Sequence, residues 1–208
     1  MPFDAVLSTN YTYELEAAFN RKYPNLSAET KRKKYSLRKD GVKREKYLLH
    51  TYNLMEKGKP EIWHIHGELR CPSSIVLSHD EYARLVRKII EFSSKRGGSY
   101  EKDRKNLEIK SWIDYFLMGD VYVLGLSYDF SDFDLWWLLG RRLREHSGCG
   151  KFIFYEPIKK EEYYKQLALR DAGVDVRNCN VIIKESTKGK DYARFYKRAI
   201  MDIQDQIK

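Results

Sequence analysis

Two imidazoles stand two residues apart in a short apolar segment, Ile62-Trp63-His64-Ile65-His66, which is followed by Gly67. Because successive side chains of a β-strand point to opposite faces, a strand here would place His64 and His66 on one face. An imidazole titrates near neutral pH and can therefore act as a general acid or base. The alternative is that both histidines are polar groups of an edge strand. No third ligand with suitable spacing accompanies them, so no metal site is predicted.

Polar turns also follow two other apolar segments. The segment at residues 4–9 is followed by Asn10, and the segment at 120–127 ends in a Gly-x-Ser turn. Parallel strands gather their carboxyl ends at one edge of a sheet, which is where ligands of open α/β sheets bind. An amide, an imidazole and a hydroxyl beside glycines suit a ribose or a nucleotide. We therefore predict that Asn10, His66 and Ser127 converge on one cleft.

The elements that must position these turns alternate along the chain. Strands are predicted at residues 4–9, 62–69, 75–78, 120–127, 151–155 and 180–184. Helices are predicted at residues 13–23, 78–92, 105–117, 135–143, 159–172 and 191–207, with Ser78 and Glu81 capping the second. Residues 47–55 fit a strand or a short helix, and residues 93–99 are predicted to be a flexible connection. This alternation predicts an α/β fold with a mostly parallel, Rossmann-like sheet and helices on both faces.

Size and composition predict a single globular domain over residues 1–208. Aromatic residues make up 14% of the chain, which argues against disorder. The three cysteines, Cys71, Cys149 and Cys179, are odd in number and form no C-x-x-C pair, so neither a disulfide framework nor a structural zinc site is indicated. The chain lacks a signal peptide at its start and any apolar run near the ~18 residues that span a bilayer. A cytoplasmic protein without a membrane partner is therefore expected.

The positive charge of the chain is concentrated in one segment. The net charge is +9, and residues 31–46 carry nine Lys or Arg against two acids, a balance of 9 − 2 = +7. A basic insertion or loop is therefore predicted at about residues 25–46. Such a run is typical of a solvated loop, and the alternative is a surface that binds nucleic acid or another polyanion.

Three motifs in this order resemble those of sirtuin-like NAD-binding domains of bacterial anti-phage systems, and those of the abortive-infection H family. They are Ser8-Thr9-Asn10-Tyr11, then Ile65-His66-Gly67-Glu68-Leu69 followed by Ile75-Val76-Leu77-Ser78 and Tyr82, then Val123-Leu124-Gly125-Leu126-Ser127 with Asp132 and Asp134. The likeness runs from about residue 3 to residue 155. It implies a sirtuin-like fold that binds NAD or a related nucleotide.

The resemblance also implies roles for single residues. Asn10 would position the nicotinamide ribose or the attacking water, and His66 would be the general base or acid. Gly125 and Ser127 would line the adenosine half of the dinucleotide. The remaining residues implied in the NAD site are Thr9, Gly67 and Asp134. From the sequence alone, Asp134 could equally cap the following helix.

The chain departs from the family pattern in three places. Thr12 stands where an acid usually follows the Asn motif, and the paired cysteines of the deacetylase zinc module are missing, which favours NAD cleavage over deacetylation. The family's glycine-rich phosphate loop lies upstream of the Asn motif, whereas only three residues precede Asp4. We therefore expect the first strand-loop unit to be missing and NAD binding to be weakened. Gly148-Cys149-Gly150 is predicted to be a helix-ending turn and no substitute, because it enters a strand.

The resemblance thus implies an NAD-directed domain, an NAD+ glycohydrolase that cleaves nicotinamide from ribose, of a bacterial defence type. No metal is expected. The alternative is a catalytically silent binding or regulatory module that engages a protein or nucleic acid through residues 31–46. A homo-oligomer or a partner chain that supplies the missing unit stays open.

Overall fold

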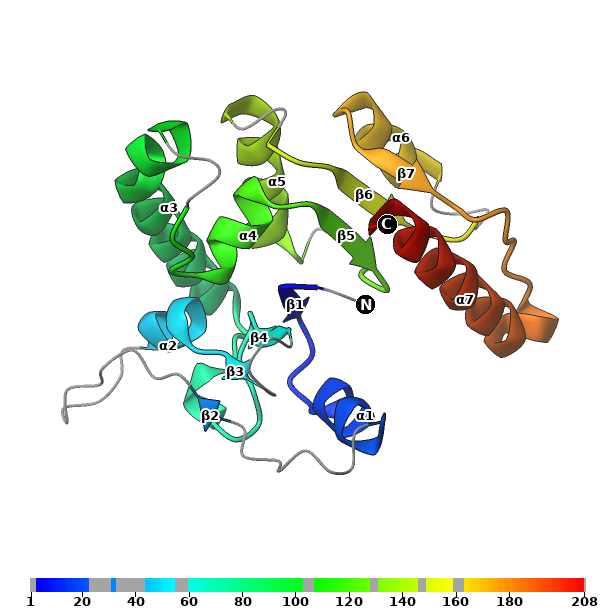
Figure 1. Ribbon diagram of the computed structural model, residues 1–208, viewed down its shortest axis with the longest axis horizontal. Helices are drawn as coiled ribbons and strands as arrows, with labels where there is room; N and C mark the ends of the chain where they lie inside the picture. Colours follow the sequence, from blue (N-terminus) through cyan, green and yellow to red (C-terminus); the bar gives the residue numbers. More distant parts are fainter. Residues whose placement is uncertain are drawn as a thin grey trace. The chain divides into compact units, whose positions relative to one another are not determined.

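The computed structural model describes residues 3–22, 31–32, 44–54, 60–102, 107–127, 131–145, 149–158 and 163–207. The chain forms two compact units, residues 1–115 and residues 116–208. Each unit has its own small β-sheet with helices beside it (Figure 1).

The N-terminal unit holds a sheet of four strands in the order β1-β4-β3-β2. The strands are β1 (Ala5–Ser8), β2 (Lys31–Arg32), β3 (Asn53–Leu54) and β4 (Glu61–His64). β1 pairs with β4 in parallel, with Ser8 opposite His64, while β3 is antiparallel to both β4 and β2. The parallel pair therefore brings the carboxyl ends of β1 and β4 side by side.

The helices of this unit are α1 (Glu14–Lys22), α2 (Arg44–His50), α3 (His79–Lys102) and the start of α4 (Trp112–Met118), with a short 3-10 helix, η1 (Pro72–Ser74). Residues 47–55, for which a strand and a short helix both fitted, contain the end of α2 and then β3. The predicted basic insertion at 25–46 lies mostly outside the described residues.

Helix α3 begins where the sequence predicted and ends ten residues later. The Ser78 hydroxyl accepts a hydrogen bond from the Glu81 amide at 3.3 Å, and the Glu81 carboxylate accepts one from the Ser78 amide at 3.0 Å, so the capping box is confirmed. The flexible connection predicted at 93–99 is wrong, because these residues are helical. Each glycine costs about 1 kcal/mol in a helix, and the buried side chains of Arg96 and Tyr100 anchor this part of α3 to α4.

The strand predicted at 75–78 is also wrong. Pro72 begins η1, and the amides of Ser74 and Ile75 donate to the carbonyls of Cys71 and Pro72 at 2.8 and 3.2 Å. These local hydrogen bonds occupy the backbone next to the segment. The amide of Val76 donates to the His66 carbonyl at 3.0 Å, but no ladder continues from it.

The C-terminal unit holds three parallel strands, β5 (Val121–Leu124), β6 (Phe152–Tyr155) and β7 (Asp175–Arg177), in that order. The helices are α5 (Phe133–Glu145), α6 (Tyr163–Asp171), the short η2 (Glu185–Thr187) and α7 (Lys188–Ile207). All four residues of β6 are buried. Helix α7 packs against β5 and buries Phe195, Ala199 and Ile203, whose spacing of four residues places them on one face of the helix.

The last predicted strand, at 180–184, is wrong, because β7 comes earlier, at Asp175–Arg177. Cys179 and Asn180 have φ of 54° and 53°, so the chain turns away from the sheet there. Only an isolated bridge, between Ile158 and Ile182, pairs the predicted segment. Left-handed residues cannot continue a strand, which is the reason for the error.

The structure is a mixed α/β fold with short parallel sheets flanked by helices, in agreement with the predicted Rossmann-like class. Strands at 4–9, 120–127 and 151–155 are confirmed within one to three residues at each end. Within the described ranges, no helix is both long and apolar enough to cross a membrane.

Candidate functional site

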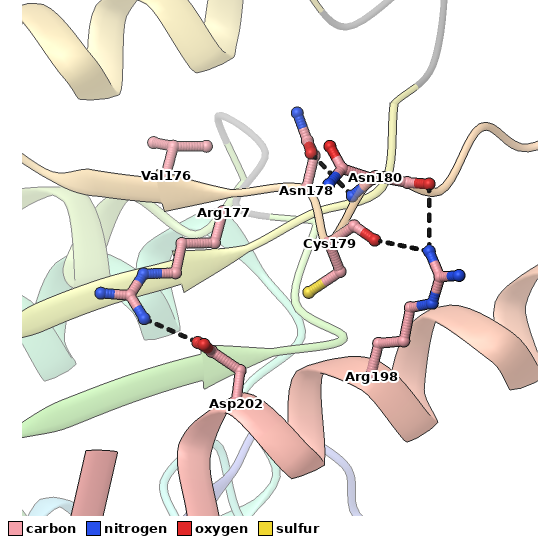
Figure 2. Close-up of a pocket in the computed structure, with 7 residues that line it drawn as sticks. All are labelled: Val176, Arg177, Asn178, Cys179, Asn180, Arg198 and Asp202. Atoms are coloured by element: carbon pink, nitrogen blue, oxygen red, sulfur yellow. Dashed lines mark hydrogen bonds and ion pairs between the residues drawn. The ribbon is translucent and has the colours of Figure 1, made fainter. Parts of the chain in front are cut away.

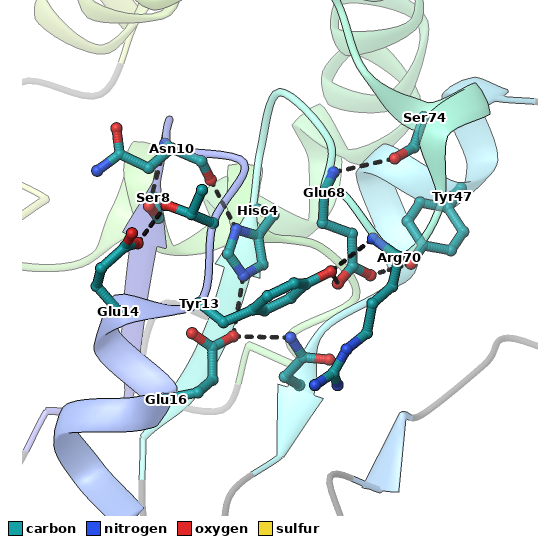
Figure 3. A network of polar contacts seen from close by, with 12 residues as sticks. Ser8, Asn10, Tyr13, Glu14, Glu16, Tyr47, His64, Glu68, Arg70 and Ser74 are labelled. Carbon is teal, nitrogen blue, oxygen red and sulfur yellow. Dashed lines mark hydrogen bonds and ion pairs between the residues drawn. The ribbon is translucent and has the colours of Figure 1, made fainter.

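Asn10 lies in the turn that follows β1. Its backbone amide donates to the Ser8 hydroxyl at 3.2 Å, and its side chain is exposed. Figure 3 shows the Asn10 carboxamide pointing away from His64, while the backbone carbonyl of the same residue points toward it. The turn thus presents the amide outward and uses the main chain for its own anchoring.

His64, the last residue of β4, is buried between this turn and α1. Its Nδ1 lies 2.7 Å from the Asn10 carbonyl oxygen, and its Nε2 lies 2.9 Å from Glu16 Oε1 (Figure 3). The Glu16 side chain of α1 is buried and also accepts a hydrogen bond from Asn53 Nδ2 at 2.9 Å. Leu15 of the same helix is 44% exposed. Helix α1 therefore turns a carboxylate, Glu16, toward His64.

His64 and Glu16 each shift the pKa of the other toward the charged form. Burial by itself would lower the pKa of His64, but the hydrogen bonds to the Glu16 carboxylate and the Asn10 carbonyl raise the pKa above its usual value. Burial would likewise raise the pKa of Glu16, and the hydrogen bond from His64 brings it below the usual value. A protonated His64 beside an ionised Glu16 is the state that both directions favour.

His66 does not share a face with His64, although strand alternation predicted that it would. β4 ends at His64, and residues 65 and 66 form a turn closed by a 3.0 Å hydrogen bond from the Gly67 amide to the His64 carbonyl. His66 is buried, and its ring meets the Tyr82 ring edge-on, with Nδ1 3.4 Å from the Tyr82 hydroxyl. His64 therefore faces α1 while His66 faces α3.

The two turns of the N-terminal unit are tied to each other. The Leu69 amide donates to the Tyr11 carbonyl at 3.0 Å, which joins the chain after His66 to the chain after Asn10. The Tyr11 hydroxyl donates to the Val76 carbonyl, also at 3.0 Å. Thr9, Asn10, His66 and Gly67 are therefore brought to the same edge of one sheet.

Gly67 is required by geometry at this edge. Its φ is +98°, and a Cβ at this position would lie 2.4 Å from the Ser74 carbonyl oxygen. The next residue, Glu68, is buried and accepts hydrogen bonds from the hydroxyls of Tyr13 and Tyr47, while its amide donates to the Ser74 hydroxyl at 3.1 Å (Figure 3). Glu68 thus fixes the chain that follows His66 to η1.

In the C-terminal unit, Gly125 and Ser127 follow β5 and are exposed. Gly125 has φ of +74°, and a Cβ there would lie 3.4 Å from the Tyr196 hydroxyl of α7. The Ser127 carbonyl accepts a hydrogen bond from Lys165 Nζ. Asp134, in the first turn of α5, is fully buried. The backbone after β5 is therefore held in place, with the Gly125 surface open.

Sequence reasoning missed Glu156, which is buried after β6. Its carboxylate lies 2.6 Å from Lys165 Nζ, so one lysine joins the chain after β5 to the chain after β6. Parallel pairing of the two strands puts both ends at the same edge. The available signal for Glu156 was its place directly after a predicted buried strand. The predicted site residues were found by the same signal, a polar or small residue at the end of a strand.

A cavity of about 600 Å³ opens in the C-terminal unit at the end of β7. Its lining residues are Val176, Arg177, Asn178, Cys179, Asn180, Arg198 and Asp202 (Figure 2). Arg198 Nη1 donates to the carbonyls of Cys179 and Asn180 at 3.0 and 3.3 Å, and Arg177 pairs with Asp202 at 2.6 Å. None of the predicted site residues lines this cavity. In the part of the chain that the structure describes, no cluster of metal-binding side chains occurs.

Comparison with protein-family models gave a match over most of the chain. A family model described as the SIR2-like domain matches residues 4–176, which include both turns of the N-terminal unit, the turn after β5 and strand β6, and which end inside β7. Neither the comparison with curated proteins nor that with solved structures returned a match. Because the family model covers most of the chain, this protein belongs to the family of SIR2-like domains.

Proposed function

We propose that this SIR2-like domain is an NAD+ nucleosidase, which hydrolyses the bond between nicotinamide and ribose, in a bacterial anti-phage defence system. Membership of the SIR2-like family supports an NAD-related function. The observation that carries the proposal is that the two turns bearing Asn10 and His66 are joined. The Leu69 amide, after His66, donates a hydrogen bond to the Tyr11 carbonyl, after Asn10.

In the proposed reaction, Asn10 and His66 act on the nicotinamide ribose. The exposed Asn10 carboxamide positions the ribose or the attacking water. His66 acts as the general base, accepts the proton of the water that attacks the ribose, and is held edge-on by Tyr82. The nicotinamide leaves as the neutral base, and ADP-ribose is the other product. Thr9 and Gly67 border the same ribose.

The adenosine half of NAD is assigned to the turn after β5. Gly125 is exposed and has no side chain, so it permits close approach of a ligand, and the exposed Ser127 offers a hydroxyl. Lys165 fixes this turn to Glu156. Asp134 is the remaining residue assigned to this half, and it lies at the start of α5 with its side chain fully buried.

Release of nicotinamide from NAD by the purified chain tests this proposal. His66→Ala and Asn10→Ala should each reduce the rate by about 10²-fold or more, as expected for loss of a general base or a positioning group. His79→Ala, which removes an exposed histidine at the start of α3, is the matched control and should leave the rate unchanged. Unchanged turnover in both site variants would contradict the proposed roles.

The second candidate is a silent binding module. It rests on the basic segment of nine Lys or Arg against two acids at residues 31–46, which fits a polyanionic partner. Binding of RNA or DNA without release of nicotinamide would favour this function over the enzyme.

A further inference from the structure

His64 makes two hydrogen bonds that require a doubly protonated ring. The Asn10 carbonyl and the Glu16 carboxylate are both acceptors, and they lie 2.7 and 2.9 Å from the two ring nitrogens. A neutral imidazole has one N–H and can satisfy only one of them. The side chains of His64 and Glu16 are 4% and 8% exposed, so water does not replace a lost partner easily.

We propose that His64 is a positioning residue of the site: as an imidazolium held by Glu16, it fixes the turn that carries Asn10 through the Asn10 carbonyl. This inference rests on the proposed function of Asn10. Asn53 from β3 holds Glu16 in turn, through the 2.9 Å hydrogen bond to the same carboxylate oxygen. The chain of contacts therefore runs from β3 through α1 and β4 to the exposed carboxamide.

Loss of the ring proton should release the turn. The Glu16 carboxylate is a stronger acceptor than a carbonyl, so the remaining proton stays on Nε2. The Nδ1 lone pair then faces the Asn10 carbonyl oxygen at 2.7 Å, which is repulsive. The Asn10 turn should then move away from His64, and a displacement of about 1 Å can cost a reaction about 10²-fold in rate.

The other charged groups around His64 act in the same direction. Glu68 favours the protonated ring electrostatically, and Glu14 of α1 interacts favourably with it. The Tyr13 ring meets the His64 ring edge-on at 5.5 Å. Because the pKa of His64 is raised, the imidazolium persists to higher pH than that of an ordinary histidine and is lost as the pH rises through this raised pKa.

The proposal therefore predicts an alkaline fall in kcat for nicotinamide release. His64→Lys keeps a cation beside Glu16 and should retain activity within about 10-fold while the alkaline fall moves to higher pH, toward the pKa of a lysine.

His64→Leu should lower kcat by about 10²-fold, with a smaller change in KM. This variant leaves the buried Glu16 charge unpaired and can fail to fold. The double variant His64→Leu, Glu16→Leu removes both charges and should melt near the wild type. It lacks the donor to Asn10, so its kcat should stay low. Full activity of the double variant would overturn the proposal.

A measurement without substrate separates this inference from the proposed function. In NMR, the ¹³C shift of the Asn10 carbonyl should titrate together with the His64 ring, and should not titrate in His64→Lys over the same pH range. If the ¹³C shift of the Asn10 carbonyl does not change while His64 titrates, the positioning role is overturned. Absence of nicotinamide release, with the coupled titration present, would instead overturn only the proposed reaction.

Asp114→Asn is the stability control. Asp114 is buried in the same unit and bonds to Arg96 and Tyr100, and it makes no contact with the Asn10 turn. Its activity per folded molecule and its pH profile should match those of the wild type. A changed alkaline limb in this variant would show that loss of stability alone moves the profile, and would overturn the inference.

Discussion

At the scale of single residues, the turn after β4 depends on a glycine that no other residue can replace without movement. Gly67 has φ of +98°, and the Ser74 backbone lies where a Cβ would be. The turn must be this tight because the Gly67 amide closes it onto the His64 carbonyl and the Glu68 amide reaches the Ser74 hydroxyl. The positions of His64 and His66, which precede Gly67 in this turn, therefore depend on the absence of a side chain at residue 67.

Gly67→Ala should reduce the free energy of unfolding by about 2 kcal/mol or more, since the left-handed backbone costs about 1 kcal/mol and the overlap adds to it. Gly97→Ala is the matched control. Gly97 lies inside α3, and nothing lies within 4 Å of the position that a Cβ would take, so the alanine should stabilise the protein by about 0.5–1 kcal/mol. Urea unfolding of both variants measures the difference. If Gly67→Ala and Gly97→Ala changed the free energy of unfolding by the same amount and in the same direction, this view of the turn would be contradicted.

At the scale of elements, one carboxylate both starts α4 and joins it to α3. Asp114 Oδ2 accepts hydrogen bonds from the amides of Lys110 and Ser111 at 2.7 and 3.1 Å, which caps the helix. Its Oδ1 accepts hydrogen bonds from Arg96 Nε at 3.0 Å and the Tyr100 hydroxyl at 2.7 Å. Asp114 is fully buried, so these partners replace its hydration.

Asp114→Ala should cost about 3–5 kcal/mol, because it leaves the buried Arg96 charge without its carboxylate and removes the cap. Asp114→Asn should cost less, since the amide oxygen can still accept some of these hydrogen bonds. Asp171→Asn, at the exposed end of α6, is the control and should change the stability by less than about 0.5 kcal/mol. Thermal and denaturant unfolding check the order of the three variants. An Asp114→Ala protein as stable as the control would show that the ion pair contributes nothing.

At the scale of the whole molecule, the excess of positive charge belongs to one stretch of sequence. Residues 31–46 contribute +7 of the net charge of +9. The field of such a stretch attracts any polyanion, so weak binding at low salt does not identify a partner. The salt dependence of binding is the informative quantity, because its slope counts the phosphates that are neutralised.

Replacement of Lys33, Lys34, Arg38 and Lys39 by Gln should reduce the slope of log Kobs against log salt for duplex DNA by about one for each charge that contacts a phosphate. Nicotinamide release should not change in this variant, because these residues lie far in sequence from the proposed site motifs. Filter binding between about 50 and 200 mM salt measures the slope. A slope equal to that of the wild type would exclude the segment as the binding surface.

Much of the fold follows from local patterns in the sequence. The apolar runs at 4–9, 120–127 and 151–155 specify strands, and Ser78 with Glu81 specifies the start of α3, because these signals act within a few residues. The fold class and the family follow from the same patterns and from the order of three motifs. The candidate site residues were named from the same kind of signal, because they lie at or just after the ends of predicted strands, and their roles stay predictions.

Only the tertiary structure decided what the side chains of those motifs contact. Alternation in a strand predicted that His64 and His66 share one face. In the structure β4 ends at His64, and the His64 imidazole is bound by Glu16, which is distant in sequence. The segment around Gly97, predicted to be a flexible connection, is helical because Arg96 and Tyr100 reach a buried aspartate. The local sequence sets where a strand or a helix can begin. Contacts between distant residues set where it ends and which protons its side chains hold, because burial and pairing change free energies that no local pattern encodes.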